Sequence, residues 1–247
     1  MPVSALADGS HRPWAHWRGH ALVVGTGGIG TALLAELPER APHLRVWSAG
    51  RTRGDLRVDL EDPASLEEFA QRAQMDLMPL RLVIVASGVL HGDGLQPEKR
   101  LSQVNVESLK RSFAVNGWGP LLLAQAVEGA LPRQEPIHFA SLSARVGSIA
   151  DNRLGGWYAY RAAKAAQNQL LRTLALEWSR RLPLACVTLL HPGTTATALS
   201  APFCSSVPEE RLFSPRRAAT HLLDVLERQG PKDTGSFLAW DGDTIPW

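Results

Sequence analysis

The sequence predicts an α/β fold of the Rossmann type, in which a doubly wound, mainly parallel sheet of seven strands has helices on both faces. Short apolar runs alternate with helical patterns along the chain, and several of these runs are continuously apolar. Parallel strands have this pattern because both of their faces are covered. The 247 residues, of which 45% are hydrophobic, are enough for a single domain with a large core.

Seven apolar runs have the length and the composition that strands favour. They cover residues 21–25, 43–49, 56–60, 81–88, 136–141, 184–193 and 235–242. Helical patterns lie between them, one ending at residue 37 and others at 62–73, 98–131, 155–181 and 215–229. The helix at 62–73 has Asp62 as its predicted N-cap and Pro63 at its first helical position.

Residues 19–247 are expected to form the single domain, behind an N-terminal tail at residues 1–18. The longest irregular segment of this domain is 194–214, which has no clear periodicity. Long irregular segments in compact domains often bind ligands. We therefore predict that residues 194–214 form a substrate-binding loop or lid.

The composition argues against several other classes of protein. The net charge is only +2 and no basic stripe is present, so nucleic acid is not an expected partner. The longest apolar stretches are shorter than the roughly 20 residues that span a membrane. Cys186 and Cys204 lack metal or disulfide spacing, so we expect reduced thiols, no metal site and a cytoplasmic protein.

The stretch GTGGIG follows the first strand directly and opens the first helix. Gly25 allows a tight turn, Gly27 lets the backbone approach a pyrophosphate, and Gly30 permits close packing of helix and strand. The N–H groups at the helix N-terminus favour phosphate. The predicted dinucleotide-binding turn therefore consists of Gly25, Thr26, Gly27, Gly28, Ile29 and Gly30.

The end of the second strand predicts which dinucleotide is bound. An acid at this place accepts a hydrogen bond from the ribose 2′-hydroxyl of NAD. This chain has Arg51 and Arg53 there, and no acid before Asp55. Because a guanidinium matches a phosphate group, Arg51 predicts a preference for NADP(H), with NAD(H) as the alternative cofactor. The structural alternative is that both arginines are solvated surface residues.

Tyr160 and Lys164 lie four residues apart on a predicted helix, and therefore on one helix face. A tyrosine with a pKa near 10 transfers protons near pH 7 only if its phenolate is stabilised, by roughly 3 to 4 kcal/mol for a shift of about two to three units. A lysine charge favours the phenolate, as would the positive nicotinamide ring of an oxidised cofactor. The structural alternative for Tyr160 is core packing.

With the glycine turn and Ser141, the Tyr160-x-x-x-Lys164 motif resembles the active site of the short-chain dehydrogenase/reductase family, from about residue 20 to the C-terminus. The stretches SARVGSIADNRLGGWYAYRAAKAA, LHPGTTATALSAPF and WDGDTIPW are more narrowly similar to the C-factor branch, which is linked to cell–cell signalling. Two motifs depart from the family. The glycine turn is one residue shorter than the usual TGxxxGxG, and Ala86-Ser87-Gly88 replaces Asn-Ala-Gly.

The resemblance implies a set of catalytic residues. Tyr160 would be the general acid/base, and Lys164 would lower the pKa of this tyrosine and bind the ribose hydroxyls. Ser141, at the end of a predicted strand, would polarise the substrate oxygen, and Ser143 is the alternative serine. Either serine could instead only cap a turn.

Asn116 matches the fourth catalytic residue of the family, and Pro120 gives a physical reason for this assignment. A proline inside a helix clashes with the carbonyl of the fourth residue before it. That carbonyl would be free to hold a water at the start of a proton relay through Lys164. The structural alternative is that Asn-Gly only forms a turn.

The resemblance also implies further contacts with the cofactor. Asp59 would contact the adenine, and the segment after the sixth strand would contact the nicotinamide carboxamide. The residues assigned to the cofactor in this way are Asp59, Leu60, Ala86, Ser87, Gly88, Tyr160, Lys164, Pro192, Gly193, Thr195 and Thr197. His191, next to this segment, is expected to be a hydrogen-bonded histidine at a strand end.

These observations predict an NADP(H)-dependent oxidoreductase that transfers a hydride between the nicotinamide and a carbonyl or secondary alcohol. The alternative is a dinucleotide-binding signalling or regulatory protein of the C-factor type, with vestigial reductase activity. The expected partners are a small-molecule substrate and, by resemblance, further copies of the chain in a dimer or tetramer. The identity of the substrate is not predicted.

Overall fold

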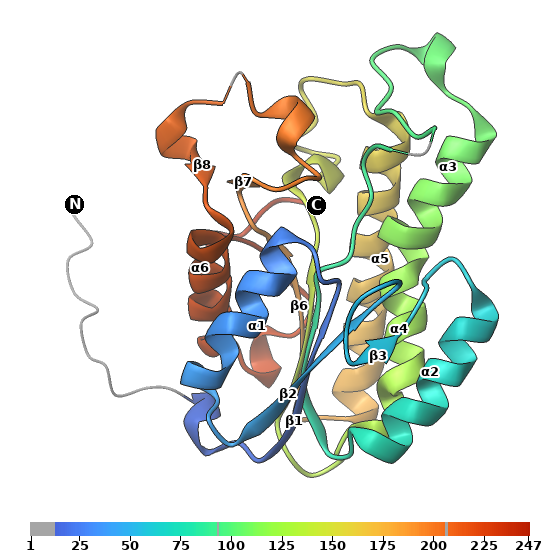
Figure 1. Ribbon diagram of the computed structural model, residues 1–247. Coiled ribbons are helices and arrows are strands. Elements are labelled where there is room, and N and C mark those ends of the chain that lie inside the picture. Colours follow the sequence, from blue (N-terminus) through green and yellow to red (C-terminus); the bar gives the residue numbers. More distant parts are fainter. Residues whose placement is uncertain (1–12, 93, 206) are drawn as a thin grey trace.

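The computed structural model describes residues 13–92, 94–205 and 207–247, and it confirms the predicted fold class. Seven strands form one sheet in the order β3-β2-β1-β4-β5-β6-β9, and every neighbouring pair in it is parallel (Figure 1). The strands are β1 (Gly19–Val24), β2 (Leu44–Gly50), β3 (Leu56–Arg57), β4 (Leu80–Val85), β5 (Ile137–Leu142), β6 (Ala185–His191) and β9 (Ser236–Ala239).

The order of the strands reverses at β1, whose neighbours are β2 and β4. In open α/β sheets, ligands bind outside the carboxyl ends of the strands at such a switch point. The glycine turn follows β1 and the Ala86-Ser87-Gly88 stretch follows β4. The topology therefore brings two of the predicted cofactor-binding segments to the same edge of the sheet.

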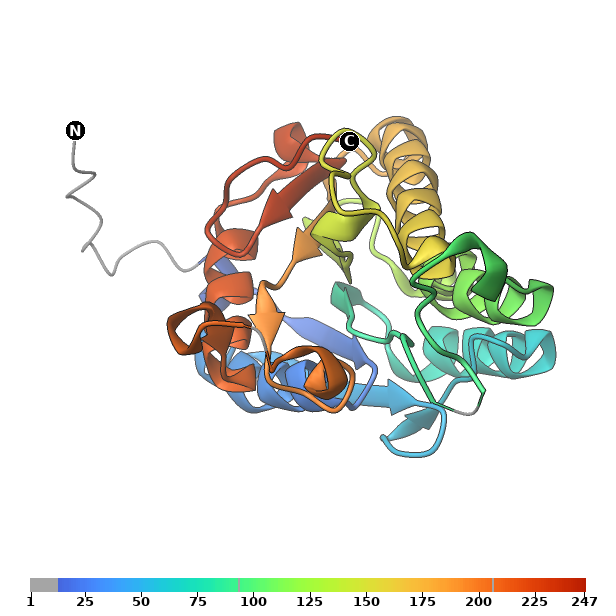
Figure 2. The ribbon, with the colours of Figure 1, turned by 90° about the horizontal axis from the view of Figure 1, so that it is seen from above.

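Helices cover both faces of the sheet, as predicted (Figures 1 and 2). Helices α1 (Gly28–Arg40) and α6 (Pro215–Glu227) pack on one face, and their cluster of buried side chains includes Leu33 and Leu223. Helices α2 (Pro63–Asp76), α4 (Gly119–Val127) and α5 (Tyr158–Arg181) pack on the other face, around a cluster that includes Phe69 and Trp178. The apolar faces of these helices and both faces of the sheet form two cores.

Helix starts follow local capping rules. The Asp62 carboxylate accepts a hydrogen bond from the Ala64 N–H, and Pro63 occupies the first turn of α2, which confirms the predicted N-cap. Helix α5 is preceded by Trp157 in the left-handed conformation, with φ of 53°. The buried Glu98 carboxylate accepts from the Ala159 N–H at 3.2 Å, so a negative charge lies at the positive end of α5.

The helix expected at residues 98–131 is divided into several segments. They are η2 (Leu101–Gln103), α3 (Val106–Ser112), the π-helix η3 (Phe113–Trp118), α4 and η4 (Glu128–Ala130). The π-helix ends two residues before Pro120, which supplies no N–H and displaces the carbonyl one turn earlier. The break predicted from Pro120 therefore takes the form of a wider helical turn that contains Asn116.

The chain from Gly193 to Phe213 contains a feature that the sequence pattern did not predict. Strands β7 (Thr194–Thr195) and β8 (Leu212–Phe213) pair with each other at the two ends of this segment. Short helical turns, η6 (Ala201–Phe203) and η7 (Glu209–Arg211), lie between them. Strands of two residues are too short to produce a period in the sequence.

The predicted tail at residues 1–18 is largely outside the described residues. Its last part forms the short helix η1 (Pro13–His16), and the Trp14 side chain is 0% exposed. The Trp14 ring packs edge-on against His138 of β5, with 5.5 Å between ring centroids. The Trp14 side chain therefore belongs to the core, because this large aromatic group fills the space at this end of the sheet.

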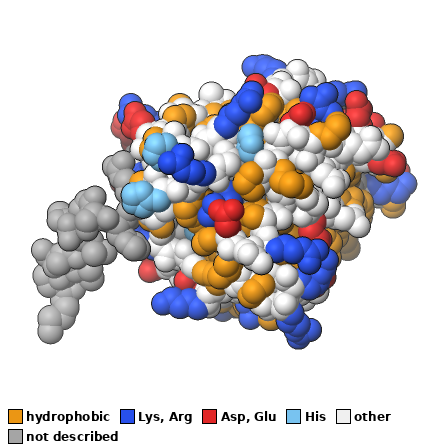
Figure 3. Space-filling view, turned by 90° about the horizontal axis from the view of Figure 1, so that it is seen from below, with side chains coloured by type: hydrophobic (Ala, Val, Ile, Leu, Met, Phe, Trp, Pro, Cys, Tyr) orange, Lys and Arg blue, Asp and Glu red, His pale blue; other side chains and the backbone are white. Residues whose placement is uncertain are grey.

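The face at the amino ends of the strands carries mixed charge (Figure 3). Lys and Arg side chains alternate there with Asp and Glu and with apolar atoms, and no patch of one sign covers this face. Among the described residues, no helix has the length and apolar character that a bilayer crossing requires.

Candidate functional site

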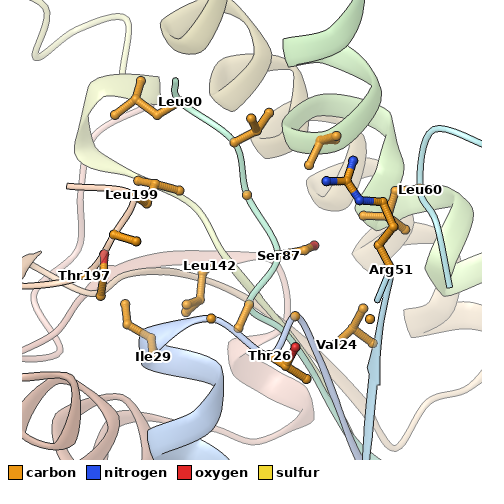
Figure 4. A pocket seen from close by; sticks show the side chains of 18 of the residues that line it. Val24, Thr26, Ile29, Arg51, Leu60, Ser87, Leu90, Leu142, Thr197 and Leu199 are labelled. Carbon is orange, nitrogen blue, oxygen red and sulfur yellow. The ribbon is translucent and has the colours of Figure 1, made fainter. Parts of the chain in front are cut away.

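A cavity of about 500 Å³ opens at the carboxyl ends of β1, β2 and β4. Figure 4 shows Arg51 and Leu60 on one side of it and Thr197 and Leu199 on the opposite side, with Ser87 between them. The volume lies within the range of about 300–1,000 Å³ that small-molecule and cofactor sites occupy. This cavity is the candidate active site.

The glycine turn forms the floor of the cavity, and its backbone requires glycine. Gly25 has φ of +101°, a conformation that side chains disfavour. A Cβ atom on Gly30 would lie 1.8 Å from the Gly25 carbonyl oxygen, so helix α1 packs against the turn only without a side chain there. At Gly27 a Cβ atom would meet no atom within 4 Å, because this position faces open space.

These features fit a dinucleotide cofactor. The space over Gly27 lets a pyrophosphate approach the start of α1, where N–H groups are directed toward it. The Ser87 hydroxyl lines the same cavity and is a buried oxygen without a hydrogen-bond partner among the described residues. Buried polar groups are seldom left unpaired, so Ser87 is suited to bond a polar group of the cofactor.

The end of the cavity beside β2, where the adenosine of a dinucleotide is predicted to bind (the adenosine end), contains charged side chains. Arg51 follows β2, and its Nη1 lies 3.6 Å from Oε2 of Glu61. Arg111, from α3, approaches Oε1 of the same glutamate at 3.8 Å. Asp55 is the first acid after β2, but its carboxylate accepts from the N–H and hydroxyl of Ser48 at 2.8 and 2.7 Å. These bonds lower the pKa of Asp55 and keep its carboxylate occupied.

Tyr160 and Lys164 both line the cavity, from the first turns of α5. The Lys164 Nζ atom lies 5.9 Å from the centre of the Tyr160 ring. It donates to the Leu142 carbonyl oxygen at 2.7 Å and to Oε1 of Gln167 at 2.9 Å. The predicted tyrosine–lysine pair is therefore assembled beside the glycine turn.

The electrostatics of this pair differ from the sequence-based expectation. Burial raises the pKa of the Tyr160 hydroxyl to about 12, and burial lowers the pKa of the Lys164 ammonium to about 7. Burial is the cause of both shifts, and in this structure the lysine does not lower the tyrosine pKa. A positive charge bound nearby, such as that of an oxidised nicotinamide ring, would act in the expected direction.

Asn116 lies in the π-helix η3 and is 0% exposed. Its side-chain oxygen accepts from the Val89 N–H at 2.9 Å, and its side-chain nitrogen donates to the Val89 carbonyl at 2.7 Å. Val89 directly follows the Ala86-Ser87-Gly88 stretch. The Asn116 side chain thus ties the π-helix to the segment after β4 and does not line the cavity.

The two candidate serines differ in position. Ser141 lies within β5, is 0% exposed, and its hydroxyl accepts from Nε2 of Gln167 at 2.7 Å. Ser143 directly follows the strand and lines the cavity, and its hydroxyl donates to Oδ1 of Asn168 at 2.6 Å. Of the two, Ser143 is the one with access to a substrate in the cavity.

The segment predicted to be a lid covers the opposite end of the cavity. Its Thr197 and Leu199 line the cavity, and a Cβ atom on Gly28 would lie 2.7 Å from Cγ2 of Thr197. Phe203 packs edge-on against Trp157, with 4.9 Å between ring centroids, and lies 5.9 Å from the His91 ring. Aromatic contacts therefore hold this segment over the site.

Most of the predicted site residues line the cavity. They are Gly25, Thr26, Gly27, Gly28, Ile29, Arg51, Asp59, Leu60, Ala86, Ser87, Gly88, Tyr160, Lys164, Pro192 and Thr197. The predicted residues that do not line it are Gly30, Asn116, Ser141, Gly193 and Thr195. Gly30 and Asn116 support its walls through the contacts described above, and Gly193 has φ of +75° beside the Phe213 ring.

Several residues at the site were not predicted from the sequence. Glu61, Arg111, Leu90 and His91 line the cavity, and Gln167 contacts Lys164. Glu61 follows Asp59-Leu60 directly, so its place beside the adenosine end could have been inferred from sequence. Arg111 and Gln167 left no such signal, because each reaches the site from a helix whose neighbours are known only in three dimensions.

The short chain dehydrogenase family model matches residues 19–206. A 1-hydroxy-2-glutathionyl-2-methyl-3-butene dehydrogenase of Rhodococcus sp. (strain AD45) is 30% identical over 190 residues, which cover 77% of this chain and 78% of the relative. The C-signal of Myxococcus xanthus is 32% identical over 148 residues, which cover 60% of this chain and 83% of that protein.

Solved structures share the fold. The NADPH-bound carbonyl reductase from chicken fatty liver has a TM-score of 0.77 at 22% identity, covering 94% of this chain and 100% of that chain. The carbonyl reductase Sniffer of D. melanogaster has a TM-score of 0.77 at 19% identity, with the same coverage. The match over residues 19–206, together with the glycine turn and the Tyr160–Lys164 pair, shows that the chain belongs to the short-chain dehydrogenase/reductase family and is an NAD(P)-dependent oxidoreductase.

Proposed function

We propose that this oxidoreductase uses NADP(H) to interconvert a carbonyl compound and a secondary alcohol. The observation that carries the proposal is the shared cavity: Tyr160 and Lys164 line the same space as the glycine turn. A dinucleotide held by the turn would extend toward Tyr160, and a substrate oxygen beside the phenol would be in reach of a proton donor. The arrangement therefore supports hydride transfer coupled to proton transfer.

Each residue has a distinct part in this proposal. When bound, the cofactor supplies the hydride. Tyr160 donates its phenolic proton to the carbonyl oxygen during reduction and accepts a proton during oxidation. With the positive charge of an oxidised nicotinamide ring nearby, Lys164 would stabilise the phenolate form, and its remaining N–H would bond a ribose hydroxyl. The buried walls around the pair exclude water, so these interactions act at low dielectric constant.

A serine after β5 would polarise the substrate oxygen. Ser141 and Ser143 are both candidates, and the cavity-lining position of Ser143 supports the second. Asn116 would act through its backbone carbonyl in the π-helix, which would hold a water at the start of a proton relay toward Lys164. Its side chain, bonded to Val89, fixes the π-helix in the position that this role requires.

The preference for NADP(H) over NAD(H) rests on the adenosine end. Arg51 lines the cavity where β2 ends, and the first acid that follows, Asp55, is bonded to Ser48. An arginine offers a 2′-phosphate a charge-assisted hydrogen bond. Two structural neighbours have NADPH or NADP in their names, which is consistent with this preference.

The alternative is a signalling or regulatory role of the C-factor type, favoured by the similarity to the C-signal of Myxococcus xanthus. A protein with that role has no need for turnover, although it could still bind a dinucleotide. Cytoplasmic localisation, the lid role of residues 194–214 and assembly as a dimer or tetramer remain proposals from the sequence. Neither Cys186 nor Cys204 takes part in a disulfide.

The test is NADPH oxidation with a panel of neutral aldehydes and ketones, compared between the parent and Tyr160→Phe. We expect Tyr160→Phe to bind NADPH like the parent and to lose at least about a hundredfold in kcat, as removal of a general acid does. Tyr158→Phe is the matched control, because Tyr158 is the other tyrosine of the chain and is 42% exposed. Activity of Tyr160→Phe within tenfold of the parent would contradict the assignment.

A further inference from the structure

We infer that Gln167 is a positioning residue for the active site, which holds the Lys164 side chain in place and links it to Ser141 in β5. This inference rests on the proposed function, and it assigns a part to a residue outside the Tyr160–Lys164 motif. The amide of Gln167 lies on α5 one turn after Lys164, and it does not line the cavity.

The hydrogen bonds fix the orientation of the Gln167 amide. Its Nε2 donates to the Ser141 hydroxyl at 2.7 Å and approaches the Leu142 carbonyl oxygen at 3.4 Å. The Leu142 carbonyl can only accept and the Lys164 ammonium can only donate, so the nitrogen must face β5 and the oxygen must face Lys164. Oε1 then accepts from the Lys164 ammonium at 2.9 Å.

All members of this network are buried. Gln167 and Ser141 are 0% exposed, and Lys164 is 3% exposed. A buried polar side chain is costly unless its groups are paired. The glutamine therefore satisfies three groups at once: its own amide, the serine hydroxyl and one N–H of the lysine.

The ammonium depends on these neutral acceptors. Tyr160 faces Lys164 from its own helix, and β5 contributes the Leu142 carbonyl. Within the described residues no carboxylate raises the pKa of Lys164, and burial alone lowers it. Of the three N–H donors of the ammonium, two are held by Leu142 and Gln167, which leaves one for a ribose hydroxyl.

This arrangement also gives Ser141 a part distinct from substrate binding. Its hydroxyl anchors the glutamine by accepting a hydrogen bond, so it acts on the lysine through Gln167. Ser141 is 0% exposed and does not line the cavity, which keeps it from the substrate oxygen. Ser143, two residues later, lines the cavity. The two serines, which were alternative candidates for one role in the sequence, would then have different roles: Ser141 would hold Gln167, and Ser143 would contact the substrate.

The chain has only four lysines, Lys99, Lys110, Lys164 and Lys232, which makes a direct titration feasible. Full-length protein labelled with carbon-13 at lysine Cε would be titrated by NMR with and without NADPH, and the Lys164 signal assigned with Lys164→Arg. In Gln167→Leu we expect the Lys164 midpoint to fall by about one pH unit or more, because an acceptor of its charged form is lost. Gln167→Glu keeps an acceptor and adds a negative charge, so its midpoint should rise above that of the parent.

Gln169→Leu is the matched control. Gln169 lies two residues further along α5, is exposed, and donates to Thr173 of the same helix. It should leave the Lys164 midpoint unchanged. A Lys164 midpoint that stays within about 0.3 pH units of the parent in both Gln167 variants would overturn the inference. If Gln167→Leu does not fold, an unmoved midpoint in Gln167→Glu is sufficient to overturn it.

Turnover provides the second readout. If Lys164 must be charged for catalysis, the basic limb of the pH profile of kcat/KM should move to lower pH in Gln167→Leu, by the same shift as the NMR midpoint. A parent that neither binds NADPH nor oxidises it would refute the proposed function, whatever the lysine titration shows. An active parent whose profile is not moved by Gln167→Leu would refute only the part of Gln167.

Discussion

Arg51 should decide the choice between the two cofactors, and the structure allows the size of this effect to be worked out. Its side chain is 55% exposed, and its guanidinium lies 3.6 Å from the Glu61 carboxylate. Exposed ion pairs of this kind contribute only about 0–1 kcal/mol, so Arg51 can turn to a 2′-phosphate at little cost. A charge-assisted hydrogen bond contributes roughly 1.5–3 kcal/mol, and partial exposure places Arg51 at the lower end.

We therefore expect NADPH to bind about tenfold more tightly than NADH, since about 1.4 kcal/mol corresponds to a factor of ten. Arg51→Ala should remove most of this difference by weakening NADPH and leaving NADH nearly unchanged. Glu61→Gln should act in the opposite direction. At a separation of about 6 Å in water, loss of its repulsion amounts to about 0.7 kcal/mol per phosphate charge, or about threefold.

The assay is calorimetric titration of both cofactors into each variant at one stated ionic strength, repeated at higher salt. Screening should reduce the difference between the cofactors. Arg53→Ala is the matched control, because Arg53 follows the same strand but does not line the cavity. Equal affinity of the parent for NADPH and NADH, or an effect of Arg53→Ala as large as that of Arg51→Ala, would refute the reasoning.

Three further predictions follow from the site and from the core. Ser143→Ala should lower kcat by about a hundredfold, because the Ser143 hydroxyl would turn from Asn168 to donate to the substrate oxygen, and the variant loses that bond. Ser141→Ala should lower kcat by less than about tenfold. The reverse ranking in steady-state kinetics would assign the role to Ser141. Phe203→Ala removes the aromatic contact with Trp157, so it should increase hydrogen exchange in residues 197–213 and leave exchange in α5 unchanged. Equal exchange in the parent and the variant would show that this contact does not hold the segment in place. Burial lowers the pKa of His138 from 6.5 to about 4. As the pH falls, His138 is therefore protonated in the unfolded chain before it is protonated in the folded protein. The free energy of unfolding should then fall by up to about 3 kcal/mol between pH 6.5 and pH 4. In urea unfolding at pH 7 and pH 4.5, His138→Phe should lose less stability than the parent; equal losses would contradict this reasoning.

The fold class and most of the residues that line the cavity could be predicted from the amino-acid sequence. Local signals were sufficient for the strands, because parallel strands are apolar on both faces, and all seven predicted runs lie in the sheet. The glycine turn could be predicted because the roles of Gly25 and Gly30 depend only on the backbone within a few residues of each. The pairing of Tyr160 with Lys164 could be predicted for the same reason, since one turn of a helix fixes their spacing.

Features that depend on contacts between distant segments could not be predicted from the sequence, because these contacts exist only in the folded chain. Trp14 was expected in a tail, but its side chain fills a space under β5 that exists only once the sheet has formed. The direction of the Tyr160 pKa shift was expected to follow the neighbouring lysine, yet burial by the whole domain is the larger effect. The contact between Lys164 and Gln167 could not be predicted from the sequence either, because the Gln167 amide is oriented by the Leu142 carbonyl, 25 positions away on another element.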